Sequence, residues 1–509
     1  VYIGSNVNDK AVVAGVAAGA GGTAAVSGTI LTVVTENKVL TNVGNKVIIT
    51  AQDLPNSAEA AADAQDDGDV HIQSSDNTTI YEFAGALSAA GTAGVGATVV
   101  VLAADKDVQA NVGDDGSVTA AGNLLVTADD KDELILLAVG FAGSGTASVA
   151  GDVNTLVFMN HTQASLGGTV HAADVTVNAS ADSTVIDIAV GASGAGVAAV
   201  TPVAVITYFQ NDTSSFIRDN ATVGTSDKHI SGNVTVTADS KEIVSGDAVS
   251  VAGSGTAAVS GTLDIIVTTL KTKAYTGTNV KINADRDLTV EASDDYLLVA
   301  SAVTVAGSGV ASVSVTAVIS VSLGTVEAYL GTNNNIKTNN VFVKATSDRD
   351  QVVVDATVAG SGTAGVAVSL TVVVAGAKMS QAAHDSIYQT DEKGNGWDPQ
   401  KELNASFASG NKKALSGKKD KLAVSLDKAL DGDGMQVGQK DYSEYGQDLS
   451  GKDSGKTADT DPLGENSSAD INESKYVEQG NSYYYTSSIG SLNNAVTALI
   501  GSGTTIKTA

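Results

Sequence analysis

The stretch Val251-Ala252-Gly253-Ser254-Gly255-Thr256-Ala257-Ala258-Val259 decides the fold of this chain, because altered copies of it recur along the sequence. The residue after the last glycine of each copy falls at positions 23, 92, 146, 197, 256, 310 and 363. The spacings between these positions are 69, 54, 51, 59, 54 and 53 residues. A period this regular indicates stacked units, each of which buries its apolar face only against its neighbours.

Each repeat contains short segments in which polar and apolar residues alternate. In the fifth repeat these include Val280-Lys281-Ile282-Asn283 and Leu288-Thr289-Val290-Glu291, which are typical of half-buried strands. About five or six strands per repeat predict roughly two coils per repeat, hence about fourteen coils and a rod about 65 Å long. We therefore expect an all-β chain, a tandem-repeat β-solenoid (β-helix) rod with an irregular inserted segment in its last repeat.

Two kinds of corner are expected between the strands. The acidic clusters at residues 129–132, 293–295 and 347–350 predict turns, because short polar side chains can bond their own backbone there. A second corner carries a glycine, which predicts a positive φ at that position. Arg218 interrupts this second pattern in the fourth repeat. The glycines of the second corner are Gly44, Gly113, Gly167, Gly277 and Gly331.

The Gly-Ser-Gly-Thr segment is read as an unusual strand, since glycine weakens a strand unless something approaches it closely. Two interpretations stay open. The small residues line a narrow wall where two sheets of one rod pack together, or they form a flat face that packs on another protomer. Only the second interpretation makes fibres.

Charge and composition exclude several classes of function. The formal net charge is −28, which repels phosphate backbones and anionic membrane surfaces, so we expect no nucleic-acid partner. No run of 18 apolar residues is present, so no membrane insertion is expected. Zero cysteines exclude disulfides, thiolate metal sites and a cysteine nucleophile.

The repeats do not continue through the whole chain. Residues 380–490 are rich in lysine and tyrosine, and the repeat pattern returns after them. We therefore divide the chain into solenoid repeats at 1–379, an insertion at 380–490 and a return to the solenoid at 491–509. The chain starts and stops in the same phase of the repeat, which predicts a window from a longer array that continues end to end.

The repeats resemble those of large bacterial filamentous adhesins of the leukotoxin type. The resemblance rests on the Gly-Ser-Gly-Thr-Ala element, on the Ala-Tyr-x-Gly corner at Ala274-Tyr275-Thr276-Gly277 and on the Val-x-Val-x-Ala strand that follows. It covers residues 1–379 and 495–509. It implies export to the cell surface or beyond, a β-helical stalk, and roles in adhesion, aggregation or building the matrix of a biofilm.

No catalytic group is expected, because the carboxylates recur with the repeat, whereas a catalytic pair should be unique. One calcium loop is a candidate, with oxygen donors at Asp391, Asn395 and Glu402, although Lys393 stands where a carboxylate should bind. An ordinary turn after a short helix at residues 380–388 is the alternative. The acidic corners are a second, weaker calcium option.

The insertion also concentrates the aromatic residues, which are common anchors in the recognition of glycans and proteins. They form either the small core of the insertion or a contact surface. The sequence thus predicts a structural or adhesive module, a stalk or filament outside the bacterial cell, whose partners are further copies of itself and surface glycans or proteins. A glycan-binding module is the alternative. The candidate contact residues are Trp397, Tyr442, Tyr445, Tyr483, Tyr484 and Tyr485.

Overall fold

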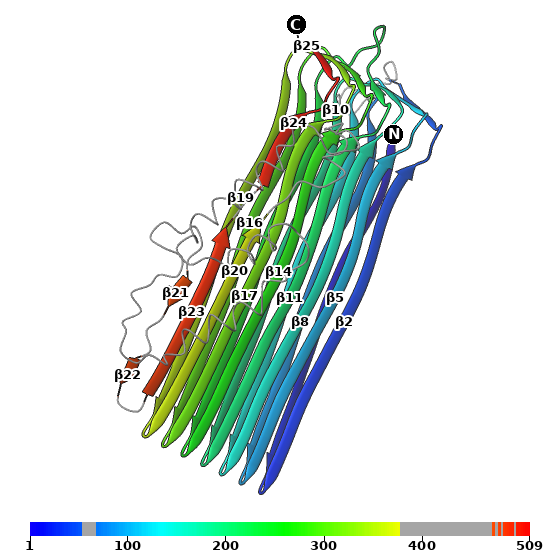
Figure 1. Cartoon of the computed structure of the whole chain (residues 1–509). Coiled ribbons are helices and arrows are strands. Elements are labelled where there is room, and N and C mark those ends of the chain that lie inside the picture. The colour runs from blue at the N-terminus through cyan, green and yellow to red at the C-terminus, as the bar shows by residue number, and fades with distance from the viewer. Residues whose placement is uncertain (53–67, 377–470, 474–476, 480–481, 493–494, 509) are drawn as a thin grey trace, which may run out of the picture.

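The computed structural model of the chain describes residues 1–52, 68–376, 471–473, 477–479, 482–492 and 495–508. All regular elements in these residues are β-strands, and they lie in three sheets whose strands run parallel apart from two short antiparallel ones. Like strands lie over like strands from one repeat to the next (Figure 1). The expected β-solenoid is confirmed.

One repeat makes one coil. In the fifth coil, β13 (Val234–Ser254) is followed by a two-residue turn, the long strand β14 (Ala257–Thr276), a corner and the short strand β15 (Lys281–Asn283). The next strand, β16 (Leu288–Ser308), then pairs with β13 one level along the axis. The predicted two coils per repeat are therefore wrong, and seven coils rise about 30 Å at 4.8 Å per level, while a 20-residue strand spans about 66 Å.

The first long sheet, sheet A, contains seven strands. Its members, in spatial order, are β1 (Tyr2–Gly21), β4 (Val70–Ala90), β7 (Leu124–Ser144), β10 (Val175–Ala195), β13, β16 and β19 (Val341–Ser361). The second long sheet, sheet B, faces it. Its first seven members are β2 (Ala24–Val43), β5 (Ala93–Val112), β8 (Ala147–Leu166), β11 (Ala198–Ile217), β14, β17 (Ala311–Leu330) and β20 (Ala364–Gly376).

The short strands form sheet C, which closes one end of the cross-section. Figure 1 places these short strands and both chain termini at the same end, far from the turns that join sheets A and B. The members of sheet C are β3 (Ile48–Ala51), β6 (Ser117–Ala120), β9 (Thr169–His171), β12 (Thr222–Val223), β15, β18 (Asn335–Thr338) and β25 (Thr505–Thr508).

The Gly-Ser-Gly-Thr segment forms the tip of each coil, where sheet A turns into sheet B, and not a strand of its own. In the fifth coil Gly255 and Thr256 are the turn between β13 and β14. A Cβ on Gly255 would collide with the backbone carbonyl of Gly196 in the previous coil. Glycine recurs at this position because the tips stack backbone on backbone.

From the second coil onward the corner glycines also serve stacking, and the prediction that the corner glycines adopt positive φ is wrong. A Cβ on Gly167 would lie 2.7 Å from Asp114 Oδ1 and 2.8 Å from the Gly113 carbonyl oxygen. The positive φ values occur two residues later, for example at Asp115 (58°) and Asn279 (58°). Asparagine and aspartate tolerate this left-handed conformation better than other residues with a Cβ.

The core between the sheets has three apolar parts separated by polar layers. The largest cluster lies between sheet C and the adjoining halves of sheets A and B, and includes Val126 and Ile282. A second cluster, with Leu134 and Phe158, fills the middle of the long sheets. Near the tips the space narrows, and the apolar residues there are alanines such as Ala199 and Ala258.

The seventh coil is interrupted within sheet B. Strand β20 ends at Gly376, and β24 (Ala495–Ile500) continues its line by pairing with the remaining part of β17. Beyond β20 lies β23 (Ser482–Leu492), which pairs with it in parallel and carries β21 (Ile471–Glu473) and β22 (Val477–Gln479) antiparallel on its outer edge. The predicted boundary at residue 380 lies outside the described residues.

Candidate functional site

The acidic clusters lie within long strands, and the prediction that they form turns is wrong. Asp130 and Asp132 belong to β7, Asp294 to β16 and Arg349 to β19, all with side chains directed between the two sheets. The sequence pattern is misleading at these acidic residues because the interior of the solenoid is itself polar at their level. Together with residues of sheet B they form an axial polar ladder.

Lys106 on β5 is the centre of the ladder. Its Nζ lies 2.5 Å from Asp130 Oδ1, 2.5 Å from Asp132 Oδ1 and 3.2 Å from Asp76 Oδ2, and all four side chains are inaccessible to solvent. Burial alone would lower the pKa of the ammonium group, but the three carboxylates raise it. Burial and the charge of Asp130 raise the pKa of Asp132, against the opposing effect of Lys106.

Asparagine side chains extend the ladder along the axis in both directions. Asn37 donates to Asp9 Oδ2 and to Asp76 Oδ2, each at 3.2 Å. On the other side, Asn160 donates to Asp130 Oδ2 at 2.8 Å and to Asn211 Oδ1 at 3.0 Å. The amide and carboxyl groups of successive coils thus bond one another, as buried polar groups must.

The ladder continues towards the C-terminal coils. Asn211 donates to Glu242 Oε1 at 2.6 Å, and burial raises the pKa of Glu242 to about 8 with a contribution from the charge of Asp294. Arg349 lies over Asp294, with Nε and Nη2 each 2.8 Å from Oδ2. Burial raises the pKa of Asp294, although Arg349 opposes this.

A second set of buried carboxyl groups lies nearer the tips. Burial raises the pKa of Glu82, Asp152 and Asp187 to about 7 and that of Asp264 to about 9. Asp187 accepts hydrogen bonds from Asn154 at 2.7 Å and from Thr207 at 3.1 Å. Near pH 7 Asp264 is therefore largely neutral and the other three groups are neutral in a large fraction of molecules, which lets acidic residues occupy the space between the sheets.

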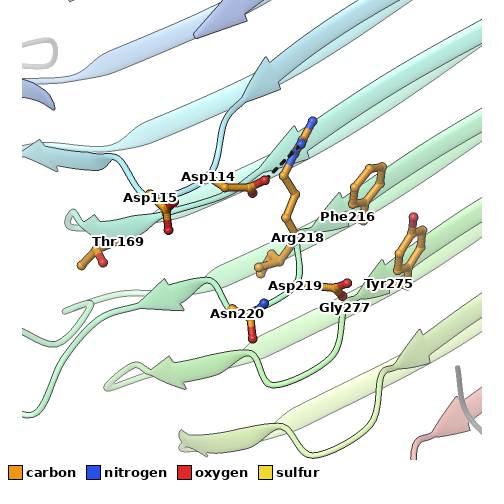
Figure 2. A pocket seen from close by; sticks show the side chains of 11 residues that line it. Asp114, Asp115, Thr169, Phe216, Arg218, Asp219, Asn220, Tyr275 and Gly277 are labelled. Carbon is orange, nitrogen blue, oxygen red and sulfur yellow. Dashed lines mark ion pairs between the residues drawn. The ribbon is translucent and has the colours of Figure 1, made fainter. Parts of the chain in front are cut away.

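An open hollow lies at the corner between sheets B and C, in the second to fifth coils. Its volume is about 450 Å³, and Figure 2 shows carboxylate, guanidinium, amide and aromatic side chains around it. Arg218 takes the place of the corner glycine in coil four. Its side chain reaches back over the third coil, where Nε donates to Ser165 Oγ at 3.0 Å, to the second coil, where Nη1 lies 3.8 Å from Asp114 Oδ2.

A column of stacked aromatic rings begins at this hollow. The ring centroids of Phe216 and Tyr275 are 4.7 Å apart, and those of Tyr275 and Tyr329 are 4.8 Å apart. Ser165 occupies the same column in the preceding coil, so Phe216 has an aromatic neighbour on one side only. Burial, with smaller effects of Asp219 and Asp212, raises the pKa of Tyr275 to about 12, so its hydroxyl stays protonated.

The hollow suits recognition of a small polar molecule with an apolar face, such as a sugar ring. The aromatic rings offer an apolar wall, while Asp114, Asp115 and Asn220 offer hydrogen-bond acceptors and Arg218 offers donors. In the sequence, Arg218 stands out only as an exception to the corner glycine. This exception indicates the position of the hollow, because a long cationic side chain replaces a residue that stacking requires to be small.

The predicted calcium and contact residues lie almost entirely outside the described part of the chain. This holds for Asp391, Asn395, Glu402, Trp397, Tyr442 and Tyr445. Tyr483, Tyr484 and Tyr485 belong to the backbone of β23. Within the described residues, no group of three or more acidic or histidine side chains could hold a metal ion, and the acidic clusters are bonded to Lys106, Arg349 and asparagines instead.

No helix in the described ranges has the length and apolar character to cross a membrane. Comparison of the chain with protein-family models, with curated proteins and with solved structures finds no match to any of them.

Proposed function

We propose that this chain is a structural module of a long extracellular or cell-surface fibrous protein, in which it forms part of a stalk or filament. The observation that carries the proposal is the stacking of seven coils, each bonded to the next through two long strand ladders and one short one. The resemblance of the repeats to those of filamentous adhesins supports the location outside the cell.

The direction of the hydrogen bonds fits a mechanical role. Strands run across the rod, so the main-chain hydrogen bonds between coils point along its axis. In β10 and β13 alone, 21 residue pairs lie in register. An axial load on the rod is therefore divided among many parallel hydrogen bonds, and the axial polar ladder adds side-chain bonds in the same direction.

The edges of the stack favour continuation by further coils. No described strand pairs with the outer edge of β1 or β2, and inward side chains there, such as Ala11 and Leu31, are only partly buried. An unpaired edge of this length is a template for another strand. A preceding repeat or the end of another copy would cover these side chains and extend the ladder.

Electron microscopy of the purified chain over a range of concentrations tests end-to-end extension. Wild-type particles should lengthen along the coil axis as concentration rises. The double variant Ala11→Lys with Leu31→Lys places two charges inside the free edge and should keep particles at single length. Asn6→Lys with Asn8→Lys adds the same charges to exposed outward positions of β1 and should lengthen normally.

Particles of wild-type chain that keep one length at every concentration would contradict end-to-end extension of the free edges. Lengthening that the Ala11 and Leu31 substitutions leave unchanged would show that other surfaces drive it.

A second function, binding of a glycan, is favoured by the corner hollow with its aromatic column. Carbohydrates stack on aromatic faces and hydrogen-bond to carboxylates, amides and guanidinium groups. We propose that Phe216 and Arg218 would form the two sides of such a site. A glycan array should then reveal binding that Phe216→Ala and Arg218→Ala each reduce at least tenfold, whereas Phe342→Ala, an exposed aromatic on sheet A, does not.

Binding lost instead in Tyr484→Ala would place glycan recognition in the aromatic-rich insertion. Absence of binding to any glycan would remove this second function and leave the structural role untouched.

A further inference from the structure

The outer face of sheet B changes character halfway along its strands. Beside sheet C it carries charges such as Glu36, Asp105 and Lys271, whereas beside the tips the seven strands expose no charged side chain. We call this uncharged half the valine face. Its columns follow residues 26, 28, 30, 32 and 34 of β2 and their register partners in β5, β8, β11, β14, β17 and β20.

The valine face is too large to be an ordinary solvent surface. Five columns spaced about 6.7 Å apart on seven strands spaced about 4.8 Å apart cover about 1,100 Å². A standard protein interface buries about 800 Å² on each partner, and contiguous apolar patches on monomers seldom exceed about 600 Å². Val259 is 43% exposed, Val315 44% and Leu370 37%, so the apolar side chains have no cover within the described residues.

The surface of the valine face forms a groove between two ridges. The column of Gly28, Ala97, Gly151, Pro202 and Gly261 runs along the axis through the first five coils. On one side lies the column of valines that contains Val149 and Val259, and on the other the column that contains Val153 and Leu263. Small residues thus form the groove floor, and larger aliphatic residues form its walls.

No contact within the chain requires glycine at the positions that form the groove. A Cβ on Gly28 would meet only the Ala97 carbonyl oxygen at 3.7 Å, and one on Gly261 only the Val315 carbonyl oxygen at 3.8 Å, both ordinary contacts. A Cβ on Gly151 would approach Pro202 no closer than 3.5 Å. Because glycine in the middle of a strand weakens it, its use here indicates close approach by something outside the chain.

We propose that the valine face binds the valine face of a second copy of this chain, so that rods pair side by side. A partner for this surface must be apolar, uncharged and shaped to fit the ridges and the groove, with the same axial spacing as the coils, and the face itself meets these conditions. In a two-fold pair the valine ridge of each copy lies in the glycine groove of the other. This pairing rests on the proposed structural role and gives the filament its thickness.

Sedimentation equilibrium of the full chain tests the pairing. Wild type should dimerise or assemble further at micromolar concentrations. Val153→Asp with Leu263→Asp, both pointing to solvent in the single chain, should weaken association at least 100-fold. Thr235→Asp with Thr237→Asp adds the same charges to the polar outer face of sheet A and should leave association unchanged. Circular dichroism verifies that each variant keeps its strands.

A second pair of variants tests the groove itself. Gly151→Ala with Gly261→Ala adds methyl groups that the single chain accepts, so the fold should be kept while association weakens at least tenfold. If the alanines leave association unchanged, the ridge does not enter the groove and the proposed geometry is wrong.

Two further outcomes would overturn the proposal. If the wild-type chain stays monomeric at high concentration, its valine face is exposed to solvent or covered by its own residues, and the proposed pairing is wrong. Chain that instead floats with phosphatidylcholine vesicles, in a manner abolished by the Val153 and Leu263 substitutions, uses this face on lipid. Electron microscopy separates this test from that of end-to-end extension, since loss of pairing narrows the filaments and loss of extension shortens them.

Discussion

Lys106 occupies in the second coil the position that asparagine occupies in the first, third and fourth coils, as the register of Asn37, Lys106, Asn160 and Asn211 demonstrates. In those coils the asparagine amide donates a hydrogen bond to at least one buried carboxyl group beside it. Lysine adds a positive charge, which lets Asp76, Asp130 and Asp132 meet in one buried place. The polar ladder is therefore assembled residue by residue from the same few side-chain types.

Lys106→Met should destabilise the fold strongly, because it leaves three carboxyl groups buried without their cation. The free energy of unfolding should fall by about 3–5 kcal/mol, measured by denaturant unfolding at pH 7. Lys38→Met is the control, since Lys38 pairs with Glu36 on the exposed face and should have little influence on stability. A Lys106→Met chain as stable as wild type would contradict the assigned role of the ammonium group.

The stability of the chain should also fall as pH rises from about 4 to about 9. A carboxyl group whose pKa is higher in the folded chain ionises at a lower pH in the unfolded chain than in the folded one. The free energy of unfolding therefore begins to fall near pH 4, and the loss is complete above the pKa of the folded chain. For Asp264, whose pKa is raised to about 9, the loss at pH 7 amounts to about 4 kcal/mol.

Asp264→Asn should therefore be more stable than wild type at pH 8, and the difference should shrink towards pH 4. Thermal unfolding across this range measures it, with Asp105→Asn on the exposed face as the control. A difference independent of pH would rule out ionisation of Asp264 as its cause.

At the scale of elements, the tip turn joins sheets A and B in every coil, and from the second coil onward it stacks on the previous tip through one glycine. In the fifth coil a Cβ on Gly255 would collide with the coil below, whereas a Cβ on Gly253 would have nothing within 4 Å. Two glycines two residues apart in one motif thus have different reasons for their presence.

Gly255→Ala should lower the free energy of unfolding by about 1–3 kcal/mol through steric strain, and Gly253→Ala should change it by less than about 0.5 kcal/mol. Urea unfolding of the two variants beside wild type measures the contrast. Equal effects would mean that the tips do not stack backbone on backbone.

The sequence predicted the repeat, the strands and the stacking, because period and alternation depend on local pattern. It did not predict the number of coils, since acidic residues inside β7, β16 and β19 interrupted the apolar pattern and were interpreted as turns. Acidic residues can occupy those positions inside a strand because they pair with Lys106 and Arg349. Both cations lie on another sheet or in another coil, so the local sequence does not reveal the pairing. The corner hollow could not be predicted for the same reason, since Asp114, Arg218 and Tyr275 meet only after four coils have stacked.

At the scale of the whole molecule, each coil contacts only its neighbours, so the stack should tolerate the loss of a complete unit. Residues 234–287 form one coil, and their removal would place β10 directly beside β16 in unchanged phase. The shortened chain should fold, with the same circular dichroism spectrum per residue and lower stability. Removal of residues 234–260 alone breaks the phase and should prevent folding of the later coils, which limited proteolysis would detect.

The distance between Gln73 and Lys344 tests the central claim, that each repeat makes one coil stacked in register on the last. These residues occupy one column of sheet A, five levels apart. The chain has no cysteine, so spin labels can be placed at Gln73→Cys and Lys344→Cys alone. Pulsed electron paramagnetic resonance should give a separation centred near 24 Å, five levels of about 4.8 Å. A separation near 48 Å, as two coils per repeat require, or a broad distribution without a peak, would contradict it.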